Sequence, residues 1–262
     1  MKKKFFTHLL MCVLCAFSLS ACFGFNTGIE TERIRSYVVA FGEFTSFGME
    51  LTDRNNIVLY WPGTDGRWVS FQDRGLEGRR YDELATQYND LSYNRKTRFG
   101  PLPPRRYVSN GIVSIDMVSD TDFDAEYPAG TSLANFVRLL SVSPMRFIES
   151  GYRATFNWQR DYPACFLRET ATFHNYFMRD VNGRNFPQNH FPISEVLSEL
   201  AQDDFRLLGT GDKFPLPSGG WELFFGFLVF DKKPENSGTH NLTVTIRRTN
   251  GRILSQTIEK AF

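Results

Sequence analysis

Residues 242–246, Leu-Thr-Val-Thr-Ile, alternate strictly between apolar and polar side chains. Such alternation is typical of a β-strand that buries one face and exposes the other. The turn residues Thr-Asn-Gly follow at 249–251, and a second segment suited to a strand comes after them. We therefore predict a β-hairpin, which restricts the fold to one in which an antiparallel sheet covers a core.

The side-chain pattern also selects the register of this hairpin. A two-residue loop would place Ile246 opposite Ser255, an apolar residue opposite a polar one. A three-residue loop places Ile246 opposite Leu254, so that apolar residues share one face. Because a one-residue slip turns a strand over, we predict the three-residue loop, with Gly251 in the left-handed conformation.

The rest of the chain is dominated by strand patterns. Residues 221–230 are almost wholly apolar and predict a strand covered on both faces. Segments rich in β-branched and aromatic residues predict further strands at 36–41, 47–51, 57–61, 68–71, 112–118 and 146–158. Short helices are expected at 81–91, at 131–140 behind Thr131 and at 195–201 behind Ser194, and an extended loop at 95–106. The expected fold class is mainly β, an antiparallel β-sandwich-like domain with short helical insertions.

The first 21 residues have the pattern of a secretory signal peptide. Lysines at 2–4 precede an apolar stretch, 5–17, which is shorter than the roughly 20 residues of a membrane-spanning helix. The stretch ends in Leu-Ser-Ala-Cys at 19–22, which resembles the lipobox of bacterial lipoproteins. The resemblance implies that the thiol of Cys22 is acylated and that the chain is cut before it. An ordinary signal peptide with a chance cysteine is the alternative.

Acylation would make membrane lipid a partner of the chain through Cys22. Several acyl chains on one residue would hold a domain at a bilayer, since each buried methylene adds about 0.8 kcal/mol. Phe23 stands where an aspartate would retain an enteric lipoprotein in the inner membrane, so we expect the outer membrane. Residues 23–26 also lack the acidic cluster that directs some lipoproteins of Bacteroidota outward, so the periplasmic and the exterior face both stay open.

Two further stretches carry a family resemblance. These are 116–136, a strand followed by an acidic loop, and 241–258, the terminal hairpin. With the lipobox they resemble uncharacterised lipoproteins of Bacteroidota, in which a β-sandwich-like domain follows the lipid anchor. The resemblance implies a location and a β fold, and it supplies no activity. The expected organisation is a signal peptide at 1–21, a lipidated tether at 22–33 and a β-rich domain at 34–262, with a division near 160–205 left open.

Charge and cysteine content narrow the classes of function. Without residues 1–21 the chain has 27 basic and 29 acidic residues, a net charge of −2. A net charge so close to zero does not indicate a basic surface that would bind nucleic acid, so no nucleic-acid partner is expected. Only Cys22 and Cys165 remain after cleavage, so we do not expect disulfide bonds to stabilise the fold. We interpret Cys165 as a small buried apolar residue.

One acidic loop has a spacing that could bind a cation. Asp120, Asp122 and Asp124 alternate along it, and hard oxygens at such spacing can coordinate calcium. The EF-hand pattern would need glycine at Ala125 and glutamate at Thr131, so it is not met. A solvated loop whose carboxylates cap backbone groups is the alternative that we favour.

No other motif points to a cofactor, and none is expected. His174, His190 and His240 lack the spacing of a zinc site. Cys165, His174 and Asn189 include the types used by thiol enzymes, but no flanking signature supports a nucleophile. No catalytic residue is therefore assigned.

Aromatic residues near turn signals are candidates for ligand binding, above all Trp61, Trp68 and Trp158. Exposed aromatic faces bind sugars or proteins, whereas a chain this rich in aromatics also needs them for its core. We favour the core for most of them. The expected function is that of an envelope lipoprotein with a non-catalytic role, binding a glycan or an envelope protein. The alternative is an envelope hydrolase that acts on glycan or peptidoglycan through paired carboxylates.

Overall fold

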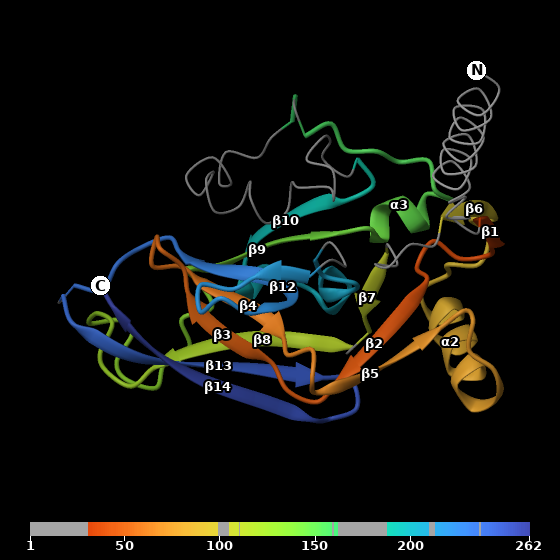
Figure 1. Cartoon of the computed structure of the whole chain (residues 1–262). Helices are drawn as coiled ribbons and strands as arrows, with labels where there is room; N and C mark the ends of the chain where they lie inside the picture. The colour runs from red at the N-terminus through yellow and green to blue at the C-terminus, as the bar shows by residue number, and fades with distance from the viewer. Residues whose placement is uncertain are drawn as a thin grey trace, which may run out of the picture. The chain divides into compact units, whose positions relative to one another are not determined.

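The computed structural model describes residues 31–98, 105–109, 111–158, 160–161, 188–209, 213–235 and 237–262 (Figure 1). The predicted signal peptide, Cys22 and most of the tether lie outside these residues. β1 (Thr31–Ile34) and β6 (Arg95–Arg98) pair as a two-stranded sheet, which belongs mainly to a small unit of its own. The second unit, 34–94 and 104–262, contains the other elements.

The largest sheet of the second unit has the strand order β10-β9-β12-β4-β3, and β11 pairs with β12. All of these pairings are antiparallel. The strands are β3 (Gly48–Leu51), β4 (Ile57–Trp61), β9 (Val137–Ser143), β10 (Phe191–Val196), β11 (Lys213–Pro215) and β12 (Trp221–Phe230).

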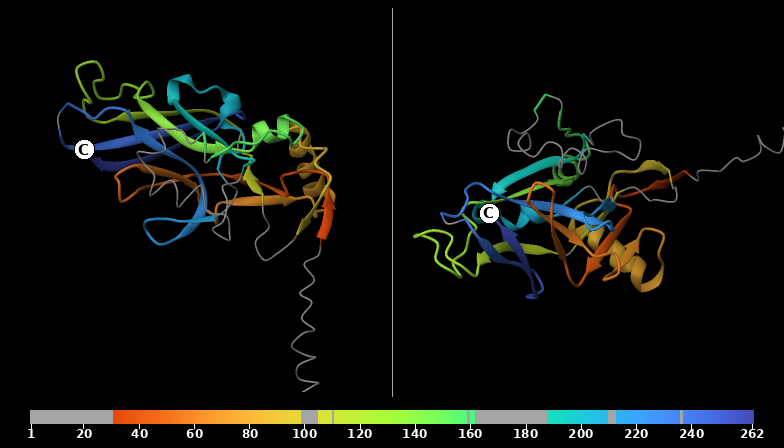
Figure 2. Two further views of the ribbon diagram at one scale, coloured as in Figure 1. Left: turned by 90° about the horizontal axis from the view of Figure 1, so that it is seen from above. Right: turned by 60° about the vertical axis from the view of Figure 1, so that its left-hand side comes forward.

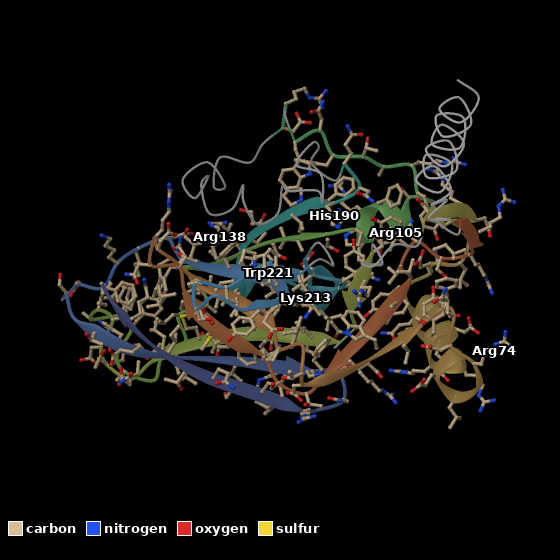
Figure 3. All side chains as sticks on the ribbon, in the orientation of Figure 1. Arg74, Arg105, Arg138, His190, Lys213 and Trp221 are labelled. Atoms are coloured by element: carbon tan, nitrogen blue, oxygen red, sulfur yellow. The ribbon has the colours of Figure 1, made fainter. Side chains whose placement is uncertain are left out.

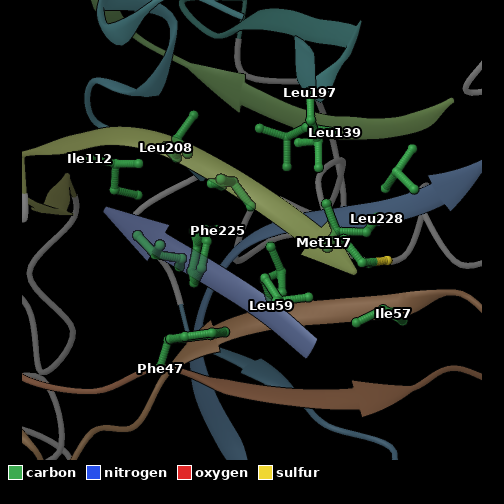
Figure 4. Close-up of a cluster of buried hydrophobic side chains, with 14 of the residues drawn as sticks. Phe47, Ile57, Leu59, Ile112, Met117, Leu139, Leu197, Leu208, Phe225 and Leu228 are labelled. Atoms are coloured by element: carbon green, nitrogen blue, oxygen red, sulfur yellow. The ribbon is translucent and has the colours of Figure 1, made fainter. Parts of the chain in front are cut away.

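A three-stranded sheet forms the opposite layer, as Figures 1 and 2 show. Its order is β14-β13-β8, from β8 (Ile112–Ser119), β13 (Thr239–Arg248) and β14 (Ile253–Ala261). The apolar cluster between the two sheets is called here the sandwich core (Figure 4). It includes Ile57, Leu59, Met117, Leu139, Phe225, Leu228, Leu242, Val244 and Ile246. The predicted β-sandwich-like fold is confirmed.

A third sheet carries both α-helices of the described residues. Its order is β5-β2-β7, from β2 (Ala40–Phe44), β5 (Gly66–Ser70) and β7 (Arg106–Val108), and β2 runs parallel to β7. The helices α2 (Gly75–Gln87) and α3 (Met145–Glu149) pack with it around a cluster called here the aromatic core. Its members include Tyr37, Phe41, Tyr81, Tyr88, Tyr107, Phe147 and Tyr152.

Strand β12 is buried on both faces, as its apolar sequence predicts. Leu223, Phe225 and Leu228 face the sandwich core, whereas Phe224 and Phe227 face a third cluster on the outer side of the large sheet. Successive side chains of a strand point to opposite faces, so an apolar run can serve two cores at once.

The predicted register of the terminal hairpin is also confirmed. Ile246 pairs with Leu254, and Leu242 pairs with Ile258. The N–H of Arg248 donates to the carbonyl of Arg252 at 3.0 Å, which leaves 249–251 as the loop. Gly251 has φ of 78°, in the left-handed region.

Four predictions of local structure are wrong. Residues 131–140 do not form a helix, because Ser132 pairs with Val118 and 137–143 enter the large sheet. Residues 146–158 begin with helix α3 rather than a strand. The expected helix at 195–201 is the end of β10 followed by a 3-10 turn, Leu197–Glu199. In the predicted loop 95–106, residues 95–98 form β6.

Two other boundaries are shifted. The helix expected at 81–91 is α2, which begins at Gly75 and ends at Gln87. The strand expected at 36–41 begins only at Ala40. The N–H groups of Tyr37 and Val38 donate to the side chain of Asp90 instead of to a neighbouring strand, so this stretch leaves the sheet.

Among the described residues, no helix has both the length and the apolar character to cross a bilayer.

Candidate functional site

The acidic loop uses its carboxylates to fix the backbone. Asp120 accepts hydrogen bonds from the backbone N–H and the side-chain amide of Asn241, at 2.9 and 2.7 Å. Asp122 accepts the N–H of Ala129 at 2.8 Å. Asp124 accepts the N–H of Tyr127 at 3.0 Å. Asp122 and Asp124 therefore cap backbone groups of the loop itself, whereas Asp120 ties the loop to Asn241 of β13.

Asp124 also has a cation of the chain itself as a partner. Nζ of Lys232 lies 2.6 Å from its Oδ2 and 4.3 Å from the ring centre of Tyr127. The hydrogen bond from Lys232 lowers the pKa of Asp124. Within the described parts of the chain, no three His, Cys, Asp or Glu side chains converge as metal ligands would. Asp120, Asp122 and Asp124 thus each have hydrogen-bond partners from the chain itself.

Two of the three candidate tryptophans belong to the interior. Trp61 is 2% exposed and stacks on Phe225, with ring centres 4.4 Å apart. Trp158 is also 2% exposed, and its Nε1 donates to the carbonyl of His190 at 3.1 Å. The binding hypothesis fails for both because their faces are covered. Trp68 is half-buried, and the guanidinium of Arg106 lies 5.3 Å from its ring centre.

The aromatic core contains a buried polar network that has no sequence motif. Asp90 is fully buried and accepts the N–H groups of Tyr37 and Val38 at 2.7 Å and the hydroxyl of Tyr152 at 2.9 Å. Burial raises the pKa of Asp90, because it disfavours the charged form. These bonds join three segments that are far apart in the sequence, so we assign Asp90 a structural role.

His190 extends this network. Its Nδ1 lies 3.2 Å from Oδ1 of Asn189, and its Nε2 lies 2.6 Å from the hydroxyl of Tyr107. An amide oxygen can only accept, so Nδ1 carries the proton and Nε2 accepts from Tyr107. Burial lowers the pKa of His190 to about 3, so the ring is neutral. Asn189 is the only member of the Cys165, His174 and Asn189 set within the described residues, and its amide donates to the hydroxyl of Tyr37.

A second buried row of polar side chains crosses the three-stranded sheet. The hydroxyl of Ser119 lies 2.8 Å from Nδ1 of His240, and His240 pairs across the strands with Lys260. Nζ of Lys260 donates to the carbonyl of Asn55 and lies 4.6 Å from the ring centre of Phe262. All three residues of this row are at most 4% exposed. A Ser–His pair enclosed in this way has no access to a substrate, so it is part of the packing.

An exposed polar and aromatic group lies where β11 and β12 meet β3 and β4. The turn between β11 and β12 buries Leu216 on the outer face of the large sheet. In the same turn the N–H and the hydroxyl of Ser218 donate to Glu50 of β3, at 2.9 and 2.6 Å. Glu222 of β12 accepts the N–H of Gly63 at 2.5 Å. Glu50 therefore ties this turn to β3, and Glu222 ties β12 to the turn after β4. Both carboxylates stay partly exposed.

Tyr60 of β4 lies beside both carboxylates. Burial, the charges of Glu50 and Glu222 and a hydrogen bond to Glu50 raise the pKa of its phenol. A Cβ on Gly48 would clash with the Tyr60 ring, so the ring packs closely on the backbone of β3. Only glycine at position 48 permits this placement of the phenol.

Trp221 and Lys213 complete the group (Figure 3). Trp221 is 62% exposed, among the highest values for a large apolar side chain in the described residues. Lys213 is exposed, and a Cβ built on Gly63 would lie 3.2 Å from its Nζ and 2.9 Å from Oε2 of Glu222. The hairpin surface is defined here as Glu50, Tyr60, Lys213, Ser218, Trp221 and Glu222. It contains an exposed indole together with hydrogen-bond donors and acceptors, and it was missed in the sequence because its members come from four separate strands and a turn.

A small pocket lies elsewhere, between α2, the start of β8 and the 3-10 turn Gln202–Phe205. Its volume is about 50 Å³, and Trp61, Tyr88, Gln87, Arg206 and Thr249 are among its lining residues. A pocket of this size has room for at least one ordered water molecule.

Comparison of the chain with protein-family models, with curated proteins and with solved structures finds no match.

Proposed function

We propose that this chain is a lipoprotein of the bacterial envelope, acylated at Cys22 and held at the outer membrane, whose β domain binds a glycan without catalysis. The lipobox at 19–22 supports the anchor, and the hairpin surface supports the binding. The proposal rests above all on Trp221, whose side chain is 62% exposed at the start of β12.

The chemistry of the hairpin surface suits a hydroxyl-rich ligand. An indole is rigid and amphipathic, so its face packs against the apolar C–H face of a sugar at small cost in entropy. The carboxylates of Glu50 and Glu222 keep free lone pairs that can accept sugar hydroxyls, and Lys213 can donate.

The rival function, a glycan hydrolase with paired carboxylates, has one observation in its favour. Glu50 and Glu222 both lie close enough to Tyr60 for their charges to raise its pKa. Hydrolysis by this route needs one carboxyl free to give up a proton and another free to attack or to activate water. Both oxygens of Glu50 already accept hydrogen bonds from Ser218, and Glu222 accepts one from Gly63. These bonds favour a binding surface over a reacting pair.

A glycan array tests the binding. We expect the full chain to bind a defined set of envelope glycans, and Trp221→Ala to weaken binding about tenfold or more, since stacking of this kind contributes about 1–2 kcal/mol. Leu76→Ala is the matched control, because Leu76 is 77% exposed on α2, outside the hairpin surface. Equal binding by the wild type and Trp221→Ala would refute the role of the hairpin surface, and an array without any bound glycan would refute the proposal.

Turnover separates binding from hydrolysis. The glycan bound by the wild type should be recovered intact after long incubation, as mass spectrometry can measure. If it were cleaved, and if Glu222→Gln abolished the cleavage, the hydrolase alternative would replace the binding proposal.

The anchor is tested by metabolic labelling with a palmitate analogue. The wild type should incorporate the label and Cys22→Ser should not, because only the thiol of Cys22 would receive the lipid. Label-free wild-type protein would overturn the envelope location and leave the glycan test unaffected.

A further inference from the structure

Strand β14 forms one edge of the three-stranded sheet. Among the strands that the structure describes, the order β14-β13-β8 gives β14 a single neighbour, β13. β14 is nine residues long and contains neither proline nor glycine. Edge strands of this length usually carry proline, a bulge or a charged side chain within the open segment that prevents pairing with another strand. The single lysine of β14, Lys260, is 4% exposed and turns inward to the carbonyl of Asn55.

The hydrogen bonds of the hairpin show which backbone groups of β14 point outward. The pair Arg248 and Arg252 is joined by a backbone hydrogen bond, and the carbonyl of Asn241 accepts from β8 rather than from β14. Hydrogen-bonded and non-bonded pairs alternate along an antiparallel ladder. The even-numbered residues of β14 therefore bond to β13. The N–H and C=O groups of 253, 255, 257 and 259 point to the open edge.

The middle of this edge is open to solvent. Ser255, Gln256 and Thr257 are all exposed. The far end is closed, since the side-chain amide of Asn55 donates to the carbonyl of Ala261 at 2.6 Å. A partner strand can thus pair with 253–259 and no further.

We propose that a second copy of this chain pairs with that edge, β14 against β14, antiparallel and around a two-fold axis at Gln256. In this register Leu254 of each copy lies opposite Ile258 of the other copy. The two symmetric pairs bring apolar residues together on the core side. The two Gln256 side chains lie opposite each other. On the outer side Ser255 lies opposite Thr257 of the other copy. This row continues the hydroxyl pair Thr245–Ser255, whose oxygens are 2.9 Å apart within one chain.

Neighbouring registers are less favourable. An axis at Ser255 would place Leu254 opposite Gln256, and an axis at Thr257 would place Ile258 opposite Gln256. Each sets an apolar residue against a polar one at two symmetric positions. A two-fold interface brings the same surface of both copies together, so the side chains that face each other must match. Of the three registers, only the axis at Gln256 places apolar residues opposite apolar residues over the whole open segment. The result is a continuous six-stranded sheet across two copies.

Cysteine cross-linking in cells that produce the full chain tests this register. At the axis the two Gln256 residues form a non-hydrogen-bonded pair, with Cα atoms about 4.5 Å apart, which suits a disulfide. Gln256→Cys should therefore give, under mild oxidation, a disulfide-linked species of twice the chain mass. Ser255→Cys is the matched control, because the two Ser255 residues would be diagonal neighbours about 7–8 Å apart. The wild type, with its native cysteines, gives the background.

We expect at least fivefold more cross-linked dimer from Gln256→Cys than from Ser255→Cys. Gln256→Lys should weaken association of the purified full chain about fivefold in sedimentation, since it sets like charges opposite each other. Gln72→Lys, in the exposed turn after β5, is the charge-matched control. Cross-linking no greater than the wild-type background, greater yield from Ser255→Cys, or a disulfide to a different polypeptide would each overturn the proposal.

Discussion

The sandwich core and the aromatic core are built on different principles. The sandwich core lies between two sheets and consists almost wholly of aliphatic and phenylalanine side chains. The aromatic core lies among the β5-β2-β7 sheet, α2 and α3, and is rich in tyrosine. Its hydroxyls need partners, and the buried Asp90 and His190 and the partly buried Asn189 supply several of them. One core is held by apolar contact, and the other also by a specific set of hydrogen bonds.

The difference teaches how each core responds to change. An apolar contact loses free energy in proportion to the volume removed, so a smaller apolar residue is tolerated in part. A buried hydrogen bond depends on the type of each partner, so an isosteric change can leave a donor without an acceptor. We expect the sandwich core to be sensitive to size and the aromatic core to chemistry.

The largest expected effect is in the sandwich core. Phe225 is fully buried and stacks on Trp61, so Phe225→Ala should lower the free energy of unfolding by about 4 kcal/mol. Urea denaturation measures this value. Ile253→Ala is the control, because Ile253 is 53% exposed and its truncation should change stability by less than about 0.5 kcal/mol. A loss below 1 kcal/mol for Phe225→Ala would show that this core is loosely packed.

The second prediction tests whether chemistry rules the aromatic core. Asp90→Asn keeps the shape of the side chain but replaces one acceptor oxygen by an NH₂ group, which would face the N–H of Tyr37 or of Val38. We expect a loss of about 2–3 kcal/mol, the cost of an unsatisfied buried donor with its repulsion. Asp82→Asn on the exposed face of α2 should have little effect in the same denaturation experiment. If both variants matched the wild type, Asp90 would not hold the network together.

The third prediction concerns pH. His190 has a folded-state pKa of about 3 against 6.5 in the unfolded chain, so the unfolded state binds more protons between these values. The stability from neutral His190 is fully present above about pH 6.5 and is lost as the pH falls toward 3. Between pH 7 and 5 the loss should be about 2 kcal/mol.

A variant isolates this contribution. His190→Gln keeps an acceptor for Tyr107 and has no titrating group, so its stability should fall less steeply over the same range. Denaturation at several pH values measures the difference in slope between the two proteins. Asp90 acts in the opposite direction, since burial raises its pKa, and it is present in both proteins. Parallel profiles would show that His190 does not couple folding to protons.

The two cores also differ in how far the sequence predicts them. The strands of the sandwich core carry a periodic signal: Leu242, Val244 and Ile246 alternate, and all three are fully buried. The incorrect predictions of secondary structure around the aromatic core arise from contacts between residues that are distant in the sequence. The late start of β2 depends on Asp90, more than 50 residues away, and no local pattern shows such a bond. Helix α3 lies where aromatic residues predicted a strand, because their rings pack in the aromatic core and not on a pleated sheet.

The candidate site was less predictable than the fold. Trp61 and Trp158 stand in the sequence beside turn signals, as exposed residues would, yet both are buried. Trp221 begins an apolar strand and suggested burial, yet it lies at the open end of β12. Exposure at a strand end depends on where the neighbouring strands stop. β4 ends at the residue that pairs with Leu223, so Trp221, two positions earlier in β12, has no residue of β4 opposite it. Only the sheet register contains that information.

The smallest of the expected effects tests the best-predicted element, the terminal hairpin. Gly251 has φ of 78°, and its Cβ position is empty space, so a side chain there would meet backbone strain and no clash. Gly251→Val should therefore cost about 1–2 kcal/mol in urea denaturation, the cost of the left-handed conformation for a residue with a Cβ. Gly238→Val is the matched control, since its Cβ position is also empty and its φ is not positive. If both variants lost equal stability, the side chain itself would be the cause, and the three-residue loop would lose its energetic basis.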